Sequence, residues 1–256
     1  MSFAQLLGTM ESFKYSKETR DIILKAAKQE FAEKGFSGGR MSSIAKRAKV
    51  NQALIHYYFS SKENLYREVL QYLFHHEETS IIEEYFKDEK LTPPEALYAA
   101  IYILVYLHHD AIDPETNRII SWEIAEGGQT FKRLLIEYLY PRLDRITLII
   151  EQGIEQGYFE TSDPFLIVFN LVNFIISFEN NKQYLKDTPW YGRFYGGDDG
   201  RRLFEYTLTA TFKALTPKGK LFSLPQISSE LQQKLHIIID KLKSTQGERY
   251  ALSKEL

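Results

Sequence analysis

Hydrophobic residues recur at helical spacing along most of the chain. In residues 17–34 they return every three or four positions, at Ile22, Ile23, Ala26, Ala27, Phe31 and Ala32, and Gly35 follows as a stop signal. Two short patterns of the same kind cover residues 42–48 and 52–58, and a longer one runs from residue 61 to about residue 78. Neither strand-like alternation nor an internal repeat is present. The pattern therefore predicts an all-α protein.

Prolines and glycines mark the ends of further predicted helices in the rest of the chain. Helices are expected over residues 93–109, 114–126, 129–156, 165–178, 201–215 and 231–243. Pro141 should restart or kink the third of these, because proline cannot donate a backbone hydrogen bond. Residues 179–200 are rich in glycine and aromatic side chains and are expected to form a long irregular loop.

The charge is unevenly distributed. The whole chain has a formal net charge of −2. Residues 14–75 contain twelve Lys or Arg and six Asp or Glu, which gives +6 there and leaves −8 for the remainder. A basic segment attached to an acidic body is typical of a protein whose basic part meets nucleic acid.

Several kinds of site are excluded or disfavoured. The chain has no cysteine, so disulfides and thiolate metal sites are ruled out. The pairs His75-His76 and His108-His109 are poor chelates, because adjacent helical residues point in different directions. We therefore expect no metal, no cofactor and no catalytic residues. No apolar run approaches the roughly 20 residues of a membrane span, and the start lacks a secretion signal, so a cytoplasmic protein without membrane contact is expected.

The segment 42–58 predicts a helix-turn-helix. Its second helix follows Asn51, a favourable N-cap, and a single helix fits the DNA major groove with its first residues at the base edges. Gln52 can bond adenine, and Ala53 and Leu54 can contact a thymine methyl group. The polar tips of His56, Tyr57 and Tyr58 could reach phosphates, as could Lys62 at the start of the next helix.

From Thr19 to Tyr66 the sequence resembles the DNA-binding region of the TetR family of repressors. The matching features are Ala26-Ala27 and Phe31 to Phe36 in the first helix, Ile44-Ala45, Val50 at the turn, Ile55 to Phe59, and Ser61-Lys62-Glu63 before Leu65. By position, the resemblance implies phosphate contacts from Arg40, Tyr57 and Lys62 and base contacts from Gln52, Ala53 and Leu54. The full expected DNA-binding set is Arg40, Ser42, Ser43, Gln52, Ala53, Leu54, His56, Tyr57 and Lys62.

Three positions depart from the family pattern. Arg40 stands where a small hydroxyl residue usually opens the second helix, so Gly39 or Ser42 is expected to act as the cap. Lys49 replaces the usual turn glycine, which suggests a different turn, because lysine tolerates a left-handed backbone poorly. His56 replaces the commonest tyrosine.

The resemblance also implies a homodimer and a variable helical C-terminal domain that binds a ligand. We expect an arm at 1–16, the helix-turn-helix domain at 17–62, an effector-binding and dimerisation domain at 63–225, and a helical extension at 226–256. Residues 164–178 and 201–215 would pair with their copies, which gives a candidate dimer interface of Phe165, Phe169, Val172, Leu203, Tyr206 and Phe212.

Aromatic residues make up 14% of the chain, and some of them could line an effector cavity. The candidates are Tyr98, Tyr102, Tyr106, Trp122, Phe131 and Tyr138, for which plain core packing is an equally good interpretation. The sequence thus favours a ligand-responsive, sequence-specific transcriptional regulator, a repressor released from double-stranded DNA by a small apolar or aromatic effector. The alternatives are a helical enzyme acting in the aromatic cavity and an architectural protein that coats DNA without sequence preference.

Overall fold

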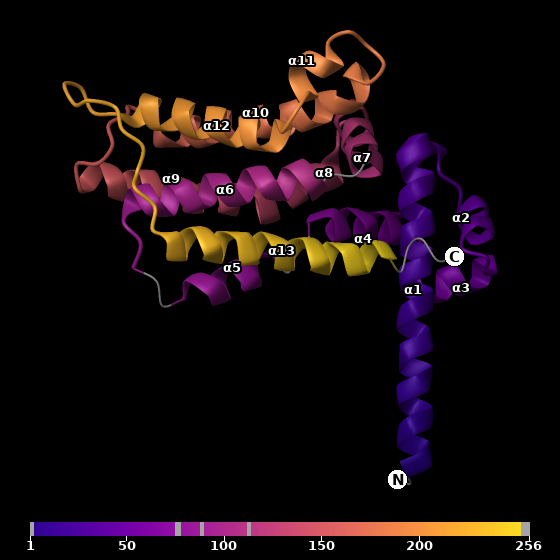
Figure 1. The fold of residues 1–256 in the computed structure, drawn as a ribbon. Helices are drawn as coiled ribbons and strands as arrows, with labels where there is room; N and C mark the ends of the chain where they lie inside the picture. The colour runs from indigo at the N-terminus through magenta and orange to yellow at the C-terminus, as the bar shows by residue number, and fades with distance from the viewer. Residues whose placement is uncertain (1–2, 75–77, 88–89, 112–113, 252–256) are drawn as a thin grey trace. The chain divides into compact units, whose positions relative to one another are not determined.

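The computed structural model describes residues 3–74, 78–87, 90–111 and 114–251, without the side chains of residues 3–17, 72–74, 78–80, 245–251 and some single positions such as Phe131 and Tyr138. All regular structure in these ranges is helical, which confirms the all-α prediction (Figure 1). The chain divides into two compact units. The first contains α1–α4, α7 and α8, and the second contains α5, α6 and α9–α13.

The first unit is built on α1 (Phe3–Gly38), which packs against α2 (Met41–Arg47), α4 (Lys62–Phe74) and α7 (Pro114–Ala125). α3 (Gln52–Phe59) packs on α2 and α4, and α8 (Gln129–Leu134) on α4 and α7. Its fully buried side chains include Ile23, Phe31, Ile44, Ile55, Phe59 and Leu65. These are the apolar positions of the helical pattern, so burial of that stripe holds the helices together.

α1 begins earlier than the pattern predicts. It begins at Phe3, so the expected arm is helical from that residue onward, in a stretch without proline. Near its other end Gly35 takes a φ of 67°, a left-handed conformation that interrupts the helical path before Gly38. The predicted stop at Gly35 is therefore confirmed: the regular helix ends there, and a separate helical turn follows to Gly38.

The helices of the second unit lie in three tiers (Figure 1). α10 (Pro164–Leu185) and α12 (Asp199–Leu215) form one tier, and α6 (Pro93–Ala111) and α9 (Tyr140–Glu155) form the next. The third contains α13 (Ser229–Ala251) and α5 (Glu78–Phe86), which pack against each other. One core joins the tiers, with Ile101, Ile150, Val168, Ile175, Leu208 and Leu235 among its buried residues.

Pro141 lies in the first turn of a new helix, α9, as predicted. Just before it, residues Leu135–Leu139 form a π-helical turn, η1, between α8 and α9. Proline at the first turn of α9 has no N–H to continue the α-helical ladder, and the backbone locally adopts the wider turn.

The expected irregular loop at 179–200 is the main error in the predicted elements. α10 continues to Leu185, a short helix α11 (Tyr191–Tyr195) follows, and α12 already begins at Asp199. The loop was expected because this stretch is rich in glycine and aromatic residues, and its first part is polar and lacks the apolar spacing that indicates a helix. Its helical path is supported by tertiary contacts instead, among them the buried side chain of Glu179.

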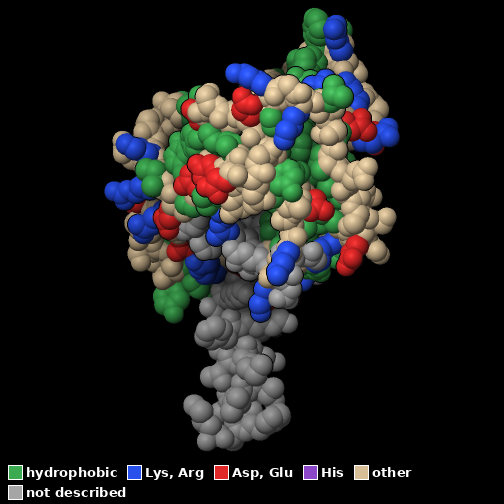
Figure 2. All heavy atoms as spheres, turned by 90° about the vertical axis from the view of Figure 1, so that its left-hand side faces the viewer, with side chains coloured by type: hydrophobic (Ala, Val, Ile, Leu, Met, Phe, Trp, Pro, Cys, Tyr) green, Lys and Arg blue, Asp and Glu red, His purple; other side chains and the backbone are tan. Residues whose placement is uncertain are grey.

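Charged side chains of both signs are interspersed with hydrophobic ones on the face shown in Figure 2. Among the residues that the structure describes, no helix is both long enough and apolar enough to cross a bilayer.

Candidate nucleic-acid interface

α3 presents one face to solvent and one to the core. The Asn51 side chain accepts a hydrogen bond from the Leu54 backbone N–H at 2.7 Å, which confirms the predicted N-cap. Ile55 and Phe59 are fully buried, while Gln52 and Ala53 are exposed. The leading turn of α3 is therefore rigidly capped, anchored by two apolar residues, and open to a ligand on its other side.

The remaining predicted contacts on α3 also lie at the surface. Tyr57 is 79% exposed, His56 is exposed, and Leu54 is half-buried. The His56 ring lies 3.5 Å from the Gln52 amide nitrogen through Nε2 and 3.1 Å from the Ser60 carbonyl through Nδ1. These contacts fix the imidazole beside Gln52, so the two side chains can act on one ligand together.

The turn between α2 and α3 has the geometry of a glycine turn although it contains lysine. Lys49 has a φ of 54°, and hydrogen bonds from Lys49 N–H to the Lys46 carbonyl and from Val50 N–H to the Ala45 carbonyl close the turn at 3.3 and 3.0 Å. The expectation of a different turn is wrong. Lys49 instead accepts the strained left-handed conformation.

α2 starts without a side-chain cap. Arg40 occupies the N-cap position and makes no capping hydrogen bond, so the expected substitution of Gly39 or Ser42 in that role is not observed. The Arg40 backbone N–H is directed instead to the Glu30 carboxylate at 3.4 Å. The Arg40 side chain is exposed, as is Ser42, and Ser43 is half-buried.

Lys62 is held close to the protein surface. Its Nζ lies 3.5 Å from the Ser37 carbonyl oxygen and 4.6 Å from the centre of the Phe36 ring. Its side chain is half-buried. The ammonium group is thus positioned beside the start of α4, where the helix dipole adds to its attraction for an anion.

A buried carboxylate joins α1 to α2, and sequence reasoning did not single it out. The fully buried side chain of Glu30 accepts hydrogen bonds from Lys34 at 2.8 Å and from Arg47 Nε at 3.1 Å. Arg47 also pairs with Glu33. Burial alone would raise the pKa of Glu30, but the bonds from Lys34 and the Arg40 backbone and the charges of Lys34 and Arg47 lower it overall. Lys34 and Arg47 therefore contribute to the architecture of the first unit.

α7 supports this unit from outside the N-terminal segment. The Tyr66 hydroxyl on α4 donates a buried hydrogen bond of 2.6 Å to Glu123 on α7. The ring of Trp122 lies against Gly35, where an added β-carbon would come within 3.0 Å of it. These long-range partners could not be identified from local sequence patterns.

The structure brings three of the six predicted effector residues together. Tyr98, Tyr102 and Tyr106 lie in the second unit, where all three rings contact Phe204 at centroid distances of 5.3–5.8 Å. Burial raises the pKa of Tyr102 to about 12, with its neighbours Tyr106 and Tyr98 adding to the effect. Trp122 belongs to the first unit. The side chains of Phe131 and Tyr138 lie outside the described residues.

The predicted dimer residues also separate into two groups. Val172, Leu203 and Phe212 are buried in the core of the second unit, so a partner chain could reach little of their surface. Phe165 is half-buried, and Phe169 and Tyr206 are exposed. An open groove of about 640 Å³ lies between α10, α11 and α12, lined in part by Phe174, Phe178, Phe194 and Tyr206.

Comparison with known proteins agrees with this geometry. The sequence model described as "Bacterial regulatory proteins, tetR family" matches residues 23–69. The chain is 50% identical over 56 residues to the HTH-type transcriptional repressor NicS of Pseudomonas putida, a stretch covering 22% of this chain and only about a quarter (26%) of NicS. It is 28% identical over 158 residues to the HTH-type transcriptional regulator RutR of Escherichia coli, covering 59% and 68% of the two chains.

The crystal structure of HlyIIR, a hemolysin II transcriptional regulator, extends the likeness to the helical body. It superimposes with a TM-score of 0.51 at 26% identity and covers 79% of this chain and 99% of its own. The matched N-terminal segment holds α2, α3 and most of α4, and the structural match reaches well beyond it. Residues 23–69 therefore match the TetR family of bacterial regulatory proteins, and the helical body has the fold of a solved regulator of transcription.

Proposed function

We propose that this protein is a sequence-specific, DNA-binding transcriptional regulator that acts as a homodimeric repressor. The observation that carries the proposal is the leading edge of α3, which is capped by Asn51 and anchored by Ile55 and Phe59. Gln52 and Ala53 are exposed on that edge. A helix held in this way loses little conformational freedom when it enters a major groove.

The roles proposed for the exposed side chains follow from their chemistry. Gln52 would bond an adenine edge, and Ala53 and Leu54 would contact thymine methyl groups. Arg40, Tyr57 and Lys62 would bind phosphates, with Ser42, Ser43 and His56 as additional hydrogen-bonding groups. The local charge of +6 in residues 14–75 favours approach to the DNA backbone.

A second copy is proposed to bind along α10 and α12. Leu166, Phe169 and Phe174 on α10 and Tyr206 on α12 are apolar or aromatic side chains that remain exposed in the single chain. Burying such a face against its own copy is the usual solution in a symmetric dimer. The open groove beside Phe174 and Tyr206 provides a concave surface for side chains of the partner.

An effector is proposed to act on the second unit. The rings of Tyr98, Tyr102 and Tyr106 against Phe204 form a packed aromatic cluster, and a small apolar or aromatic molecule would have to part α6 from α12 to enter it. A molecule that favours the parted arrangement and DNA that favours the closed one would weaken each other's binding by the same factor.

The experiment that tests the function is selection of fragments bound from genomic DNA, followed by affinity measurements on the selected site. We expect a preference over random duplex of about 10³-fold or more at physiological salt. Equal affinity for both would support a DNA-coating role instead. A reporter gene under the selected site should be expressed more strongly when the protein is absent, and lower expression would contradict repression.

Two variants distinguish base contacts from phosphate contacts. Gln52→Ala should relax the preference at one base pair, at a cost of about 1–3 kcal/mol for the selected site. Lys62→Ala should weaken binding to all sequences alike and reduce the slope of log affinity against log salt by about one unit. Lys186→Ala, at an exposed position in the second unit, is the control for loss of one charge and should change neither property. Identical behaviour of the first two variants would contradict the proposed roles.

A further inference from the structure

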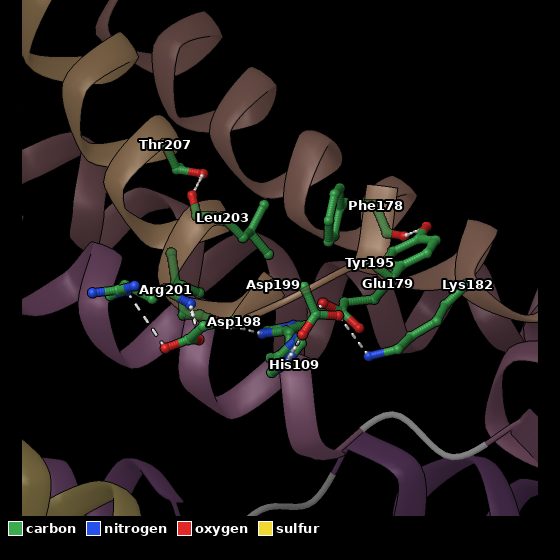
Figure 3. Close-up of polar contacts among 12 residues, drawn as sticks. His109, Phe178, Glu179, Lys182, Tyr195, Asp198, Asp199, Arg201, Leu203 and Thr207 are labelled. Carbon is green, nitrogen blue, oxygen red and sulfur yellow. Dashed lines mark hydrogen bonds and ion pairs between the residues drawn. The ribbon is translucent and has the colours of Figure 1, made fainter. Parts of the chain in front are cut away.

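The end of α6 in the second unit is attached to α10 and α12 by a cluster of four charged side chains (Figure 3). His109 Nδ1 lies 2.7 Å from Glu179 Oε1 on α10, and His109 Nε2 lies 3.3 Å from Asp199 Oδ1 at the start of α12. Lys182 Nζ is 2.9 Å from the other Asp199 oxygen. The side chains of His109, Glu179 and Asp199 are at most 15% exposed, so water screens these interactions weakly.

The positions of the two carboxylates determine which form of His109 fits. A neutral imidazole has one N–H donor and one nitrogen lone pair, whereas both nitrogens of an imidazolium donate. Because each ring nitrogen of His109 faces a carboxylate oxygen, the neutral ring would direct a lone pair at one of them. Only the imidazolium satisfies Glu179 and Asp199 together.

The ring has little room to escape this position. A β-carbon added at Gly200 would come within 2.9 Å of His109 Cδ2, so the backbone of α12 packs directly on the imidazole. With His109 protonated the cluster has two positive and two negative charges. Loss of the proton leaves one uncompensated negative charge in a mostly buried place, which is costly.

We propose that His109 is a pH-sensitive joint whose imidazolium holds the end of α6 to α10 and α12, and whose deprotonation releases that end. α6 contributes His108 beside it, which bonds the Leu104 carbonyl through Nδ1 at 2.8 Å. α10 contributes Glu179 and Lys182, and α12 contributes Asp199. From α11, the Tyr195 ring lies beneath Lys182 at 5.6 Å.

The charges around these two neighbouring histidines act in opposite directions. The hydrogen bond to Glu179 and the negative charges of Glu179 and Asp199 raise the pKa of His109, against smaller opposing effects of burial and Lys182. Burial lowers the pKa of His108, with Arg142 of α9 adding to that shift. The fold therefore favours the charged form of His109 and the neutral form of His108.

The direction of the pH dependence follows from the raised pKa. A group that binds its proton more tightly in the folded state stabilises that state fully below its unfolded pKa, near 6.5 for histidine. The stabilisation is lost as pH rises through the higher folded pKa. The joint is thus closed in mildly acidic solution and opens on the alkaline side of about pH 6.5.

The first test is an NMR titration of the full chain carrying ¹³C-labelled histidine, with the His109 signal assigned by its absence in His109→Gln. We expect His109 to titrate above 6.5 and to shift down in Glu179→Gln, which keeps the shape of the partner but removes its charge. A titration at or below 6.5, or one unchanged in Glu179→Gln, would overturn the proposal.

The second test is hydrogen exchange of the last turn of α6, corrected for the intrinsic pH dependence of exchange. In the unaltered protein, protection should fall about tenfold between about pH 6 and about pH 9. In His109→Gln it should already be low and stay constant. His236→Gln, which alters an exposed histidine on α13, is the control and should behave like the unaltered protein. If protection in the unaltered protein did not change between about pH 6 and about pH 9, the ring would have a purely structural role, and that result would also refute the joint.

Discussion

The buried carboxylate of Glu30 determines how firmly the helix-turn-helix is attached to α1. Glu30→Gln keeps the size of the side chain but removes the charge that accepts from Lys34, Arg47 and the Arg40 backbone. Because hydrogen bonds to charged groups contribute more than neutral ones, we expect a loss of about 1–3 kcal/mol in the free energy of unfolding. Urea denaturation followed by circular dichroism measures it.

The pH dependence of the same variant gives an independent check. The folded pKa of Glu30 lies below its ordinary value of 4.5, so its contribution is complete above that pH and is lost as the pH falls through the lower folded pKa. The difference between the two proteins should therefore shrink in acid. Glu33→Gln alters an exposed partner of Arg47 and should cost less than about 1 kcal/mol. A similar loss in both variants would show that burial of Glu30 is unimportant.

At the scale of single residues, local sequence patterns predicted helix caps and helix faces, but they did not predict buried polar pairs between distant residues. Asn51, Ile55 and Gln52 were predictable, because N-cap preference and helical spacing depend only on near neighbours. The partners Tyr66 and Glu123 lie 57 positions apart, and nothing in either local sequence specifies the other. Buried polar pairs of this kind depend on the assembled fold.

At the scale of elements, the turn from α2 to α3 is strained by its lysine. The φ of 54° at Lys49 brings a β-carbon into the left-handed region, which costs roughly 1–2 kcal/mol in non-glycine residues. Lys49→Gly removes this strain but also adds freedom to the unfolded chain, so we expect a net stabilisation of about 0.5–1 kcal/mol. Thermal unfolding measures the difference.

Lys49→Ala is the matched control for that prediction. It removes the same charge and long side chain but keeps the β-carbon, so it should not stabilise the protein. If Lys49→Gly and Lys49→Ala proved equally stable, backbone strain at this turn would be negligible.

The predicted helices match the observed ones where apolar spacing and helix-terminal residues indicated the same boundaries. α3, α6 and α12 follow their predicted ranges to within a few residues. α10 is longer than predicted, because its last turns are polar and carry no apolar pattern. In these turns Glu179 and Lys182 belong to the charged cluster of His109 and Asp199. Tertiary ion pairs can extend a helix that has no apolar stripe of its own, and such support is invisible to a periodicity argument.

At the scale of the whole molecule, the proposed dimer can be tested at an exposed aromatic residue. Tyr206 is 62% exposed in the single chain and its ring lies 5.3 Å from that of Phe174. Tyr206→Glu should leave the monomer folded, because the new charge faces solvent there, but would bury a carboxylate in the interface. We expect the dimer dissociation constant to rise by about 100-fold, measured by sedimentation velocity.

Ile237→Glu on α13, which also replaces an exposed apolar residue by a charge, should leave the association unchanged. If Tyr206→Glu dimerised as strongly as the unaltered protein, the interface would have to lie elsewhere than at this part of α12.

The same pair of variants connects assembly to DNA recognition. A dimer places two copies of α3 in successive major grooves, about 34–36 Å apart, so both half-sites contribute to the affinity for a whole operator. A monomer engages one half-site with the same side chains and gains nothing from the second. Tyr206→Glu should therefore bind a single half-site as tightly as the unaltered protein, yet lose most of the additional affinity for the complete site at concentrations where it is monomeric. Equal losses on both DNAs would instead indicate that the substitution damages the reading helix, and the separation of assembly from base recognition would fail.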